Sequence, residues 1–286
     1  MTPILKDDIV KHIDSIPAFN TTIAKVIQLS GDPQSQTKDL IKTISIDLSL
    51  TAEILKLINS AYFGLAGTVF SLNRAVVMLG MNTVKNVAIS SSLISSLKMR
   101  DDFLWFTSGE FWEHSLGCAV GSKIIAEHLN IKVQEREEYF IAGLLHDIGK
   151  LVLVQHFPDE YSKLLDPDNF QGKSRSELEN AEFGISHATL GSMMAKNWKL
   201  PDSLADTIGC HHKLVLSGEG YDKIRTAVHV ADYECNKREI GIKNSCEQEK
   251  LDPRAYDELG LDEEKVSKIF NDLEEQVENA KVFLKQ

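Results

Sequence analysis

Histidine and aspartate side chains in the second half of the sequence could together hold metal ions. The run LLHDIGK at 144–150 places adjacent His146 and Asp147 at the end of an apolar stretch. Taking an imidazole and a carboxylate out of water is costly unless a partner compensates them. That partner is either a metal ion or a hydrogen-bond network. The candidate metal ligands are His114, His146, Asp147, His187, His211, His212 and Asp232.

The chemistry of these side chains favours a divalent transition metal. Neutral imidazoles together with a carboxylate that can bridge suit Fe, Mn, Zn or Ni, whereas calcium prefers oxygen ligands. The set exceeds the need of one ion, so one or two ions are expected, and two ions sharing Asp147 would hold a hydroxide ready to attack phosphorus. The alternative without a metal stays open. His146 and Asp147 could simply pair and hold two helices together, because spacing this long is not a compact ligand motif.

Lys150 follows one helical turn after His146 and Asp147, and two interpretations of it stay open. Its ammonium could meet a substrate phosphate beside the metals as a point charge. It could instead interact with the C-terminal dipole of its helix or extend to water. On the first interpretation Asp147 and Lys150 are the candidate catalytic residues. The other histidines are interpreted as ordinary core or surface residues: His12, His128, His156 and His229.

Length and charge limit the classes of function. The chain has 286 residues, enough for one large core or two modest lobes, and a formal net charge of −11. So negative a chain is unsuited to broad nucleic-acid binding, which depends on neutralising phosphates. Its cysteines show no CxxC pairing, which favours reduced thiols, and no apolar segment has the length of a membrane span. We therefore expect a cytoplasmic protein with no nucleic-acid partner and no membrane partner.

Helical periodicity runs through nearly the whole sequence and places the candidate ligands on helices. No convincing strand alternation appears, so the predicted class is all-α. Neighbouring helical residues point about 100° apart, so His211 and His212 can converge only near a helix end. Helices are predicted over 108–130, 135–156, 158–165, 174–183, 186–198, 201–212, 222–240 and 262–285, with a loop over 241–252.

A change of composition near 99–104 divides the expected fold, because charged residues there precede an aromatic cluster. We expect an N-terminal helical lobe over 1–100 and a second helical lobe over 101–250. The stretch 251–286 is expected to end in a helix that packs on the body, so that the chain forms one unit overall.

Several motifs in the second lobe resemble the HD superfamily, which contains metal-dependent phosphohydrolases. They are WEHS at 112–115, LLHDIGK at 144–150, the stretch over 183–212 and AVHVAD at 227–232. On this resemblance, His114, His146-Asp147 and Asp232 stand at the metal positions of the superfamily. The resemblance also implies that the C-terminal lobe is HD-domain-like.

The upstream motifs resemble a narrower group, the HDOD family, which is the HD-related output domain of bacterial signalling proteins. They are IPAFNTTIAKVIQLSGDP at 16–33, SIDLSLTAEILKLINSAYFG at 45–64 and AVVMLGMNTVKN at 75–86. The whole resemblance spans about residues 15–240. It implies a regulatory protein of two helical lobes, and many relatives are thought to lack hydrolase activity.

Three further histidines look like the additional ligands of the two-metal HD-GYP branch of the superfamily, which cleaves cyclic di-GMP. That branch follows its histidine pair with a glutamate and a DGxGYP turn. Here Lys213 follows the pair, and GEGYD at 218–222 only imitates the turn, so cyclic di-GMP hydrolysis is not predicted. The three histidines are His187, His211 and His212.

Two functions are therefore expected from the sequence. The first is a bacterial signal-transduction protein with a His/Asp metal centre and little or no hydrolase activity, acting through an unidentified signalling protein partner. The alternative is a metal-dependent phosphohydrolase or phosphodiesterase that acts on a nucleotide or cyclic nucleotide. A nucleotide ligand fits both.

Overall fold

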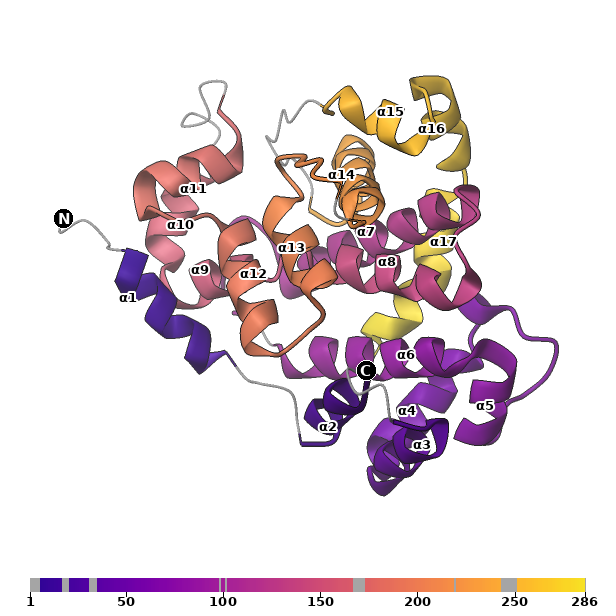
Figure 1. The fold of residues 1–286 in the computed structure, drawn as a ribbon. Helices are drawn as coiled ribbons and strands as arrows, with labels where there is room; N and C mark the ends of the chain where they lie inside the picture. Colours follow the sequence, from indigo (N-terminus) through magenta and orange to yellow (C-terminus); the bar gives the residue numbers. More distant parts are fainter. Residues whose placement is uncertain are drawn as a thin grey trace.

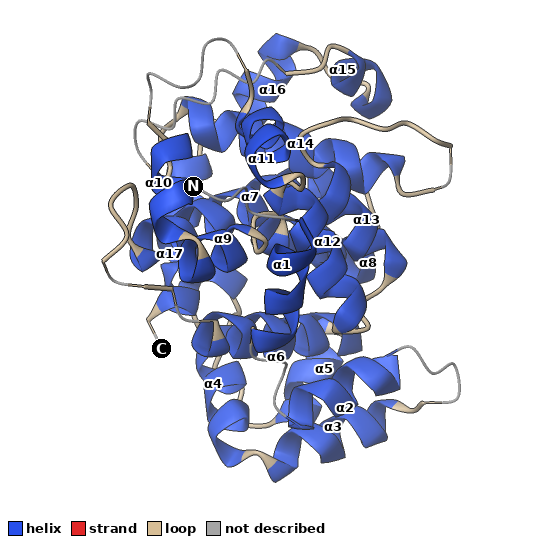
Figure 2. Cartoon of the chain, turned by 90° about the vertical axis from the view of Figure 1, so that its left-hand side faces the viewer, coloured by secondary structure: helices blue, strands red, loops and turns tan. Residues whose placement is uncertain are grey.

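The computed structural model describes residues 6–16, 21–30, 35–97, 99–100, 102–166, 173–218, 220–242 and 251–285. Within these ranges helices are joined by loops and turns, and no strand occurs (Figure 2). The all-α prediction is confirmed. Within the same ranges, no helix has the length and apolar character needed to cross a membrane.

Helices α2 to α6 form the lower part of the molecule in Figure 1. Helix α2 packs on α3 and α6, and α4 packs on α5 and α6. The first helix lies apart from this group (Figure 1), and the turn η1 that follows it packs on α9 and α12. The bounds are α1 (Lys6–Lys11), η1 (His12–Ser15), α2 (Thr21–Ser30), α3 (Thr37–Ile46), α4 (Leu48–Ile58), η2 (Ala61–Phe63), α5 (Leu72–Leu79) and α6 (Met81–Ser96).

Of the elements that follow α6, α8, α14, α16, α17 and η4 pack on α7, and α6 packs on α8. Helix α12 packs on α13 and α9. Their bounds are α7 (Ser108–His128), α8 (Val133–Leu145), α9 (Lys150–His156), α10 (Pro158–Leu164), α11 (Arg175–Phe183), α12 (His187–Asn197), α13 (Asp202–Cys210), α14 (Asp222–Lys237), α15 (Arg254–Leu259), α16 (Glu263–Ile269), α17 (Leu273–Ala280) and η4 (Lys281–Leu284).

Helix α7 is central because its first turn is capped and its middle turns suit burial. Thr107 and Glu110 form a capping box that fixes its first turn. Apolar and small residues then surround the helix on all sides, as expected for a helix without a solvent face. A Cβ atom on Gly121 would lie 2.9 Å from the Phe270 ring, and one on Gly117 would lie 2.8 Å from Ile240. Glycine therefore lets neighbouring elements approach the helix that carries His114.

Two predicted helices are broken. The single helix predicted over 135–156 ends at Leu145, and α9 begins only at Lys150. The amphipathic helix predicted over 262–285 is divided into α16, α17 and η4. Phe270, fully buried, occupies the second break. At the first break the apolar spacing continues because residues 146–149 are all buried, whereas at the second Asn271 and Asp272 are exposed and Phe270 and Leu273 keep the apolar spacing.

Candidate metal centre

The turn over 146–149 directs two polar side chains into the protein interior. His146 and Asp147 are buried there, between the end of α8 and the start of α9. A Cβ atom on Gly149 would lie 2.8 Å from the carbonyl carbon of His187 and 2.7 Å from the backbone nitrogen of Gly191. Only glycine therefore allows the turn to contact α12 so closely, and this contact brings Asp147 to His187.

A first donor group lies on one side of the turn and consists of His114, Cys118, His146 and Asp232. Their donor atoms all lie within 4.8 Å of one another, and all four residues are buried. Asp232 Oδ1, from α14, lies 3.1 Å from His114 Nε2 and 3.6 Å from His146 Nε2. Asn236, one turn along α14, donates a hydrogen bond to the same oxygen at 2.8 Å.

A second donor group lies on the other side and consists of Asp147, His187, His211 and His212. His187 Nε2 lies 3.2 Å from Asp147 Oδ1, 3.4 Å from His211 Nε2 and 2.7 Å from His212 Nε2. His187 begins α12, whereas His211 and His212 follow directly after α13. The two adjacent imidazoles converge at a helix end, as the sequence argument required.

Asp147 stands between the two donor groups with one carboxylate oxygen toward each. Its Oδ2 lies 3.4 Å from His146 Nε2 and 3.7 Å from His114 Nε2. Its Oδ1 lies 3.2 Å from His187 Nε2 and 3.7 Å from His211 Nε2. This arrangement suits a carboxylate that bridges two ions.

Lys150 is tied to this carboxylate. Its Nζ donates to Asp147 Oδ2 at 2.6 Å, and its side chain is buried. Because Lys150 is the first residue of α9, its charge does not lie at a helix C-terminus, and the dipole interpretation is wrong. Its ammonium also does not extend to water.

Backbone carbonyls orient two of the histidine rings. His146 Nδ1 lies 2.7 Å from the carbonyl oxygen of Gly143, and His211 Nδ1 lies 2.7 Å from that of Ile208. A carbonyl oxygen can only accept, so each Nδ1 carries the proton. In the neutral ring, Nε2 then presents its lone pair to the donor group. Metal-binding histidines are commonly oriented by such outer contacts.

A buried glutamate orients the His187 ring. Glu179 Oε2 lies 2.6 Å from His187 Nδ1 and accepts a second hydrogen bond from the His187 backbone nitrogen at 2.7 Å. Its other oxygen accepts from the Tyr161 hydroxyl at 3.0 Å. Burial alone would raise the pKa of Glu179, but the neighbouring His187 outweighs it and lowers that pKa. Glu179 is therefore an ionised acceptor that holds Nε2 of His187 toward Asp147.

The charges of the centre are strongly coupled. Burial alone would raise the pKa of Asp147, but His146 and Lys150 hold it well below its ordinary value. Although burial opposes its protonation, Asp147 and Asp232 raise the pKa of His146 to about 10. Burial and the neighbouring histidines lower the pKa of His211 well below its ordinary value. The centre thus contains ionised carboxylates and both charged and neutral imidazoles.

Two buried atoms of the centre have no hydrogen-bond partner: His146 Nε2 and Asp147 Oδ1. Buried polar atoms without partners carry a free-energy penalty. Both atoms belong to the donor groups, and the donor set is of the kind that binds Fe, Mn, Zn or Ni. The residues present therefore fit a divalent transition metal on each side of Asp147.

Solvent reaches the centre on one side at most. His114, His146, Asp147, His187 and His211 are each no more than 2% exposed, and Asp232 is 5% exposed. Among the predicted ligands, only His212 is partly exposed.

The structure brings all the predicted ligands together, although they come from five separate segments. Two residues of the centre were missed. Cys118 could have been found, because it lies one turn after His114 on the same helix face, whereas Glu179 has no signal in the sequence. Of the histidines set aside, His229 contacts the centre, because its Nδ1 lies 2.7 Å from the His211 carbonyl oxygen.

The GEGYD stretch takes part in no donor group. Asp222 accepts hydrogen bonds from the backbone nitrogens of Ser217 and Gly218 at 3.1 and 2.7 Å. Arg225 donates to Asp222 at 2.8 Å. Residue 219 lies outside the described residues. The described part of this stretch anchors the start of α14 and contributes no ligand to the donor groups.

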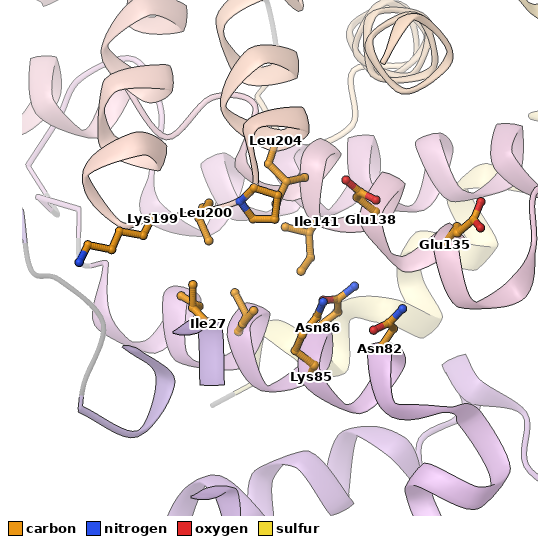
Figure 3. Close-up of a pocket in the computed structure, with 12 residues that line it drawn as sticks. Ile27, Asn82, Lys85, Asn86, Glu135, Glu138, Ile141, Lys199, Leu200 and Leu204 are labelled. Atoms are coloured by element: carbon orange, nitrogen blue, oxygen red, sulfur yellow. The ribbon is translucent and has the colours of Figure 1, made fainter. Parts of the chain in front are cut away.

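A separate pocket of about 430 Å³ opens between two groups of helices, α2–α6 and the helices that follow α6. Figure 3 shows its side chains coming from α2 and α6 on one side and from α8 and the α12–α13 connection on the other. Its apolar lining includes Ile27, Ile89 and Leu204, and its polar lining includes Lys85, Asn86 and Glu138. Its lining contains none of the predicted metal ligands.

Solved structures share this fold. An HDOD domain protein of unknown function from Geobacter sulfurreducens has a TM-score of 0.78 at 21% identity, over 96% of this chain and 97% of that one. A Shewanella amazonensis SB2B protein provisionally named a phosphohydrolase has a TM-score of 0.73 at 23% identity, over 96% and 97%. A Marinobacter aquaeolei VT8 protein provisionally named a signal transduction protein has a TM-score of 0.73 at 24% identity, over 95% and 60%.

Sequence comparisons point in the same direction. An uncharacterized protein of Treponema pallidum (strain Nichols) is 27% identical over 234 residues, which are 81% of this chain and 44% of that protein. The chain thus spans less than half the length of this relative. The family model of the HDOD domain matches residues 16–214. Since this match covers well over half of the sequence, the chain belongs to the HDOD domain family.

Proposed function

We propose that this protein is a bacterial, cytoplasmic signal-transduction protein with a His/Asp centre for one or two divalent transition metal ions and little or no hydrolase activity. The centre stabilises the helices around α7, and a signalling protein partner receives the output. We further propose a division into lobes over 1–100 and 101–250, with the stretch 251–286 packing on the body. Membranes and nucleic acids are not partners.

The burial of the centre is the observation that carries this proposal. A hydrolase must admit a phosphodiester to its metals, yet the donor atoms here lie inside the core and only His212 is partly exposed among the predicted ligands. Lys150, which could have met a phosphate, is committed to Asp147 at 2.6 Å. Such an arrangement suits the retention of a metal ion better than the binding and release of a substrate.

One experiment tests both parts of the proposal. The full chain is purified without added metal, its metal content is measured by elemental analysis, and phosphodiesterase activity is assayed with bis(p-nitrophenyl) phosphate and cyclic nucleotides in Mn or Fe. We expect one or two bound ions and turnover no higher than that of the Asp147→Asn variant. Protein that neither retains nor takes up metal contradicts the metal centre. If the wild type shows substantial turnover and Asp147→Asn abolishes it, the proposal of little or no hydrolase activity is contradicted.

The alternative function is a metal-dependent phosphohydrolase, and the geometry of Asp147 favours it. A carboxylate with one oxygen toward each donor group is suited to hold two ions side by side. Bound ions would supply Lewis acidity and an activated water. Asp147 would then position both ions, and Lys150 would have to leave Asp147 before it could contact a nucleotide phosphate.

The pocket between the two groups of helices is where we propose that a nucleotide-type ligand binds. Pockets of this size are typical for small molecules. Asn86 and Lys85 offer hydrogen bonds beside an apolar wall. The negative charge of Glu138 would repel a ligand that carries several phosphates. A ligand in this place would contact both groups of helices and could alter their packing.

Thermal shifts with adenosine and adenosine monophosphate test this ligand proposal. We expect the midpoint of the wild type to rise and that of Asn86→Leu to stay unchanged. Asn73→Leu, on the exposed face of α5, is the matched control and should respond like the wild type. Equal midpoints with and without either compound would contradict the proposal for this ligand class.

A further inference from the structure

Cys118 occupies a position in the first donor group that a simple core cysteine would not need. It is fully buried on α7, four residues after His114, so both side chains point the same way. Its Sγ lies 3.7 Å from His114 Nε2 and 3.9 Å from Asp232 Oδ1. A buried cysteine usually contacts apolar atoms, whereas this one faces an imidazole and a carboxylate.

A second observation at the same place is independent of the thiol. His146 Nε2 is fully buried, has no hydrogen-bond partner and belongs to the same donor group. It lies 3.6 Å from Asp232 Oδ1. The group therefore lacks an atom that would satisfy the imidazole, and the thiol lies where it could join in binding that atom.

The separations between the donor atoms match a shared ion. With metal–nitrogen and metal–sulfur bonds of about 2.0 and 2.3 Å, the donors of a tetrahedral site lie about 3.3–3.6 Å apart. The four separations that involve Asp232 or join Cys118 to His114 run from 3.1 Å, between His114 and Asp232, to 3.9 Å, between Cys118 and Asp232, and all the donor atoms lie within 4.8 Å of one another. Small side-chain adjustments would bring all four donors onto one ion.

We propose that the Cys118 thiolate is a metal ligand, so that the first donor group binds a thiolate-compatible ion such as Zn or Fe(II). This inference rests on the proposed metal centre and deepens it. On binding, the S–H bond breaks, an S–metal bond forms and the proton passes to solvent. The second donor group offers only imidazoles and a carboxylate. The two positions therefore differ in metal preference, because thiolates select softer ions than nitrogen and oxygen donors do.

Cobalt(II) titration of the metal-free full chain tests the inference without an activity assay. Bound cobalt gives visible d–d absorption from any ligand set, whereas a thiolate ligand adds charge-transfer absorption in the near ultraviolet. We expect both in the wild type. Cys118→Ser should lose the charge-transfer absorption and keep the d–d absorption. The matched control is Cys210→Ser, which removes a partly buried thiol outside the donor groups, and should keep both.

The outcomes separate this inference from the proposed function. Cobalt d–d absorption without charge transfer in the wild type, or charge transfer that persists in Cys118→Ser, overturns the thiolate ligand and leaves the metal centre intact. No cobalt absorption at all overturns both. If the serine variant does not fold, X-ray absorption of the zinc-loaded wild type decides, because a sulfur ligand gives a distance of about 2.3 Å and its absence refutes the inference.

Discussion

Replacing Gly149 by alanine should damage both the stability and the metal centre. The new Cβ atom would overlap the His187 carbonyl oxygen and would lie 2.7 Å from the Gly191 nitrogen, whereas ordinary contacts begin at 3.4 Å. The turn and α12 must therefore separate by more than about 0.7 Å, and overpacked cores typically lose about 1–3 kcal/mol. Both obstacles are main-chain atoms, so a side chain cannot give way. We expect a loss of about 3 kcal/mol, the upper end of that range.

The same separation should act unequally on the two donor groups. His187 moves with α12, away from Asp147, whereas His114 and Asp232 belong to helices that the new methyl group does not touch. Gly149→Ala should therefore retain metal in the first donor group and lose it preferentially from the second. Metal content by elemental analysis at limiting metal, beside urea unfolding of the metal-free protein, measures the two effects separately.

Gly109→Ala is the matched control. A Cβ atom there would meet only the Thr107 hydroxyl oxygen at 3.8 Å, and alanine is favoured over glycine in a helix by about 0.5–1 kcal/mol. The control should unfold at the same or a higher urea concentration than the wild type. If Gly149→Ala unfolds no earlier than Gly109→Ala, the close approach of the turn to α12 is refuted.

Three further predictions follow from the centre. Glu179→Gln should weaken metal retention by about 10–100-fold, as loss of an outer contact to a ligating histidine usually does; chelator competition measures it, and the exposed control Glu182→Gln should leave retention unchanged. Chelation should lower the melting midpoint, since an ion present at 1,000 times its Kd stabilises the folded state by about 4 kcal/mol; an unchanged midpoint would refute a stabilising ion. In the metal-free protein the pKa of His146 is raised to about 10, so its contribution to stability is complete below its ordinary pKa of about 6.5 and is lost as the pH rises through 10. Urea midpoints from pH 7 to 10.5 test this, and a decline that is just as steep in His146→Gln would contradict the assignment.

The sequence was most informative about residues whose position is set by the helix that carries them. His114, His187 and Asp232 lie on helices whose apolar spacing is continuous, and their convergence follows once those helices share a core. The pair at 211–212 could be placed near a helix end from geometry alone. The family motifs, found in order along the chain, indicated which of these segments contribute ligands to one site. Helical periodicity does not provide this.

The features that escaped prediction depend on contacts between distant segments. The apolar run from Leu144 to Phe157 continues through the turn at 146–149, so periodicity gives no sign that the helix ends. Gly149 becomes significant only when α12 lies against it. Glu179 precedes His187 by eight residues on another helix, and no local pattern distinguishes it from the surface glutamates nearby.

Access to the centre depends on the chain that follows α13. His212 is the one predicted ligand that is partly exposed, so a substrate would have to enter beside it. Arg225, a buried side chain of α14, holds this connection by donating to the Val215 carbonyl oxygen at 2.9 Å and to the Asp206 carboxylate. Admitting a phosphodiester would require these contacts to break, and Lys150 would still have to release Asp147. An ion needs neither change, because the donor atoms already face one another. On the proposed function, the same core would therefore retain a metal although the chain would hydrolyse little or nothing.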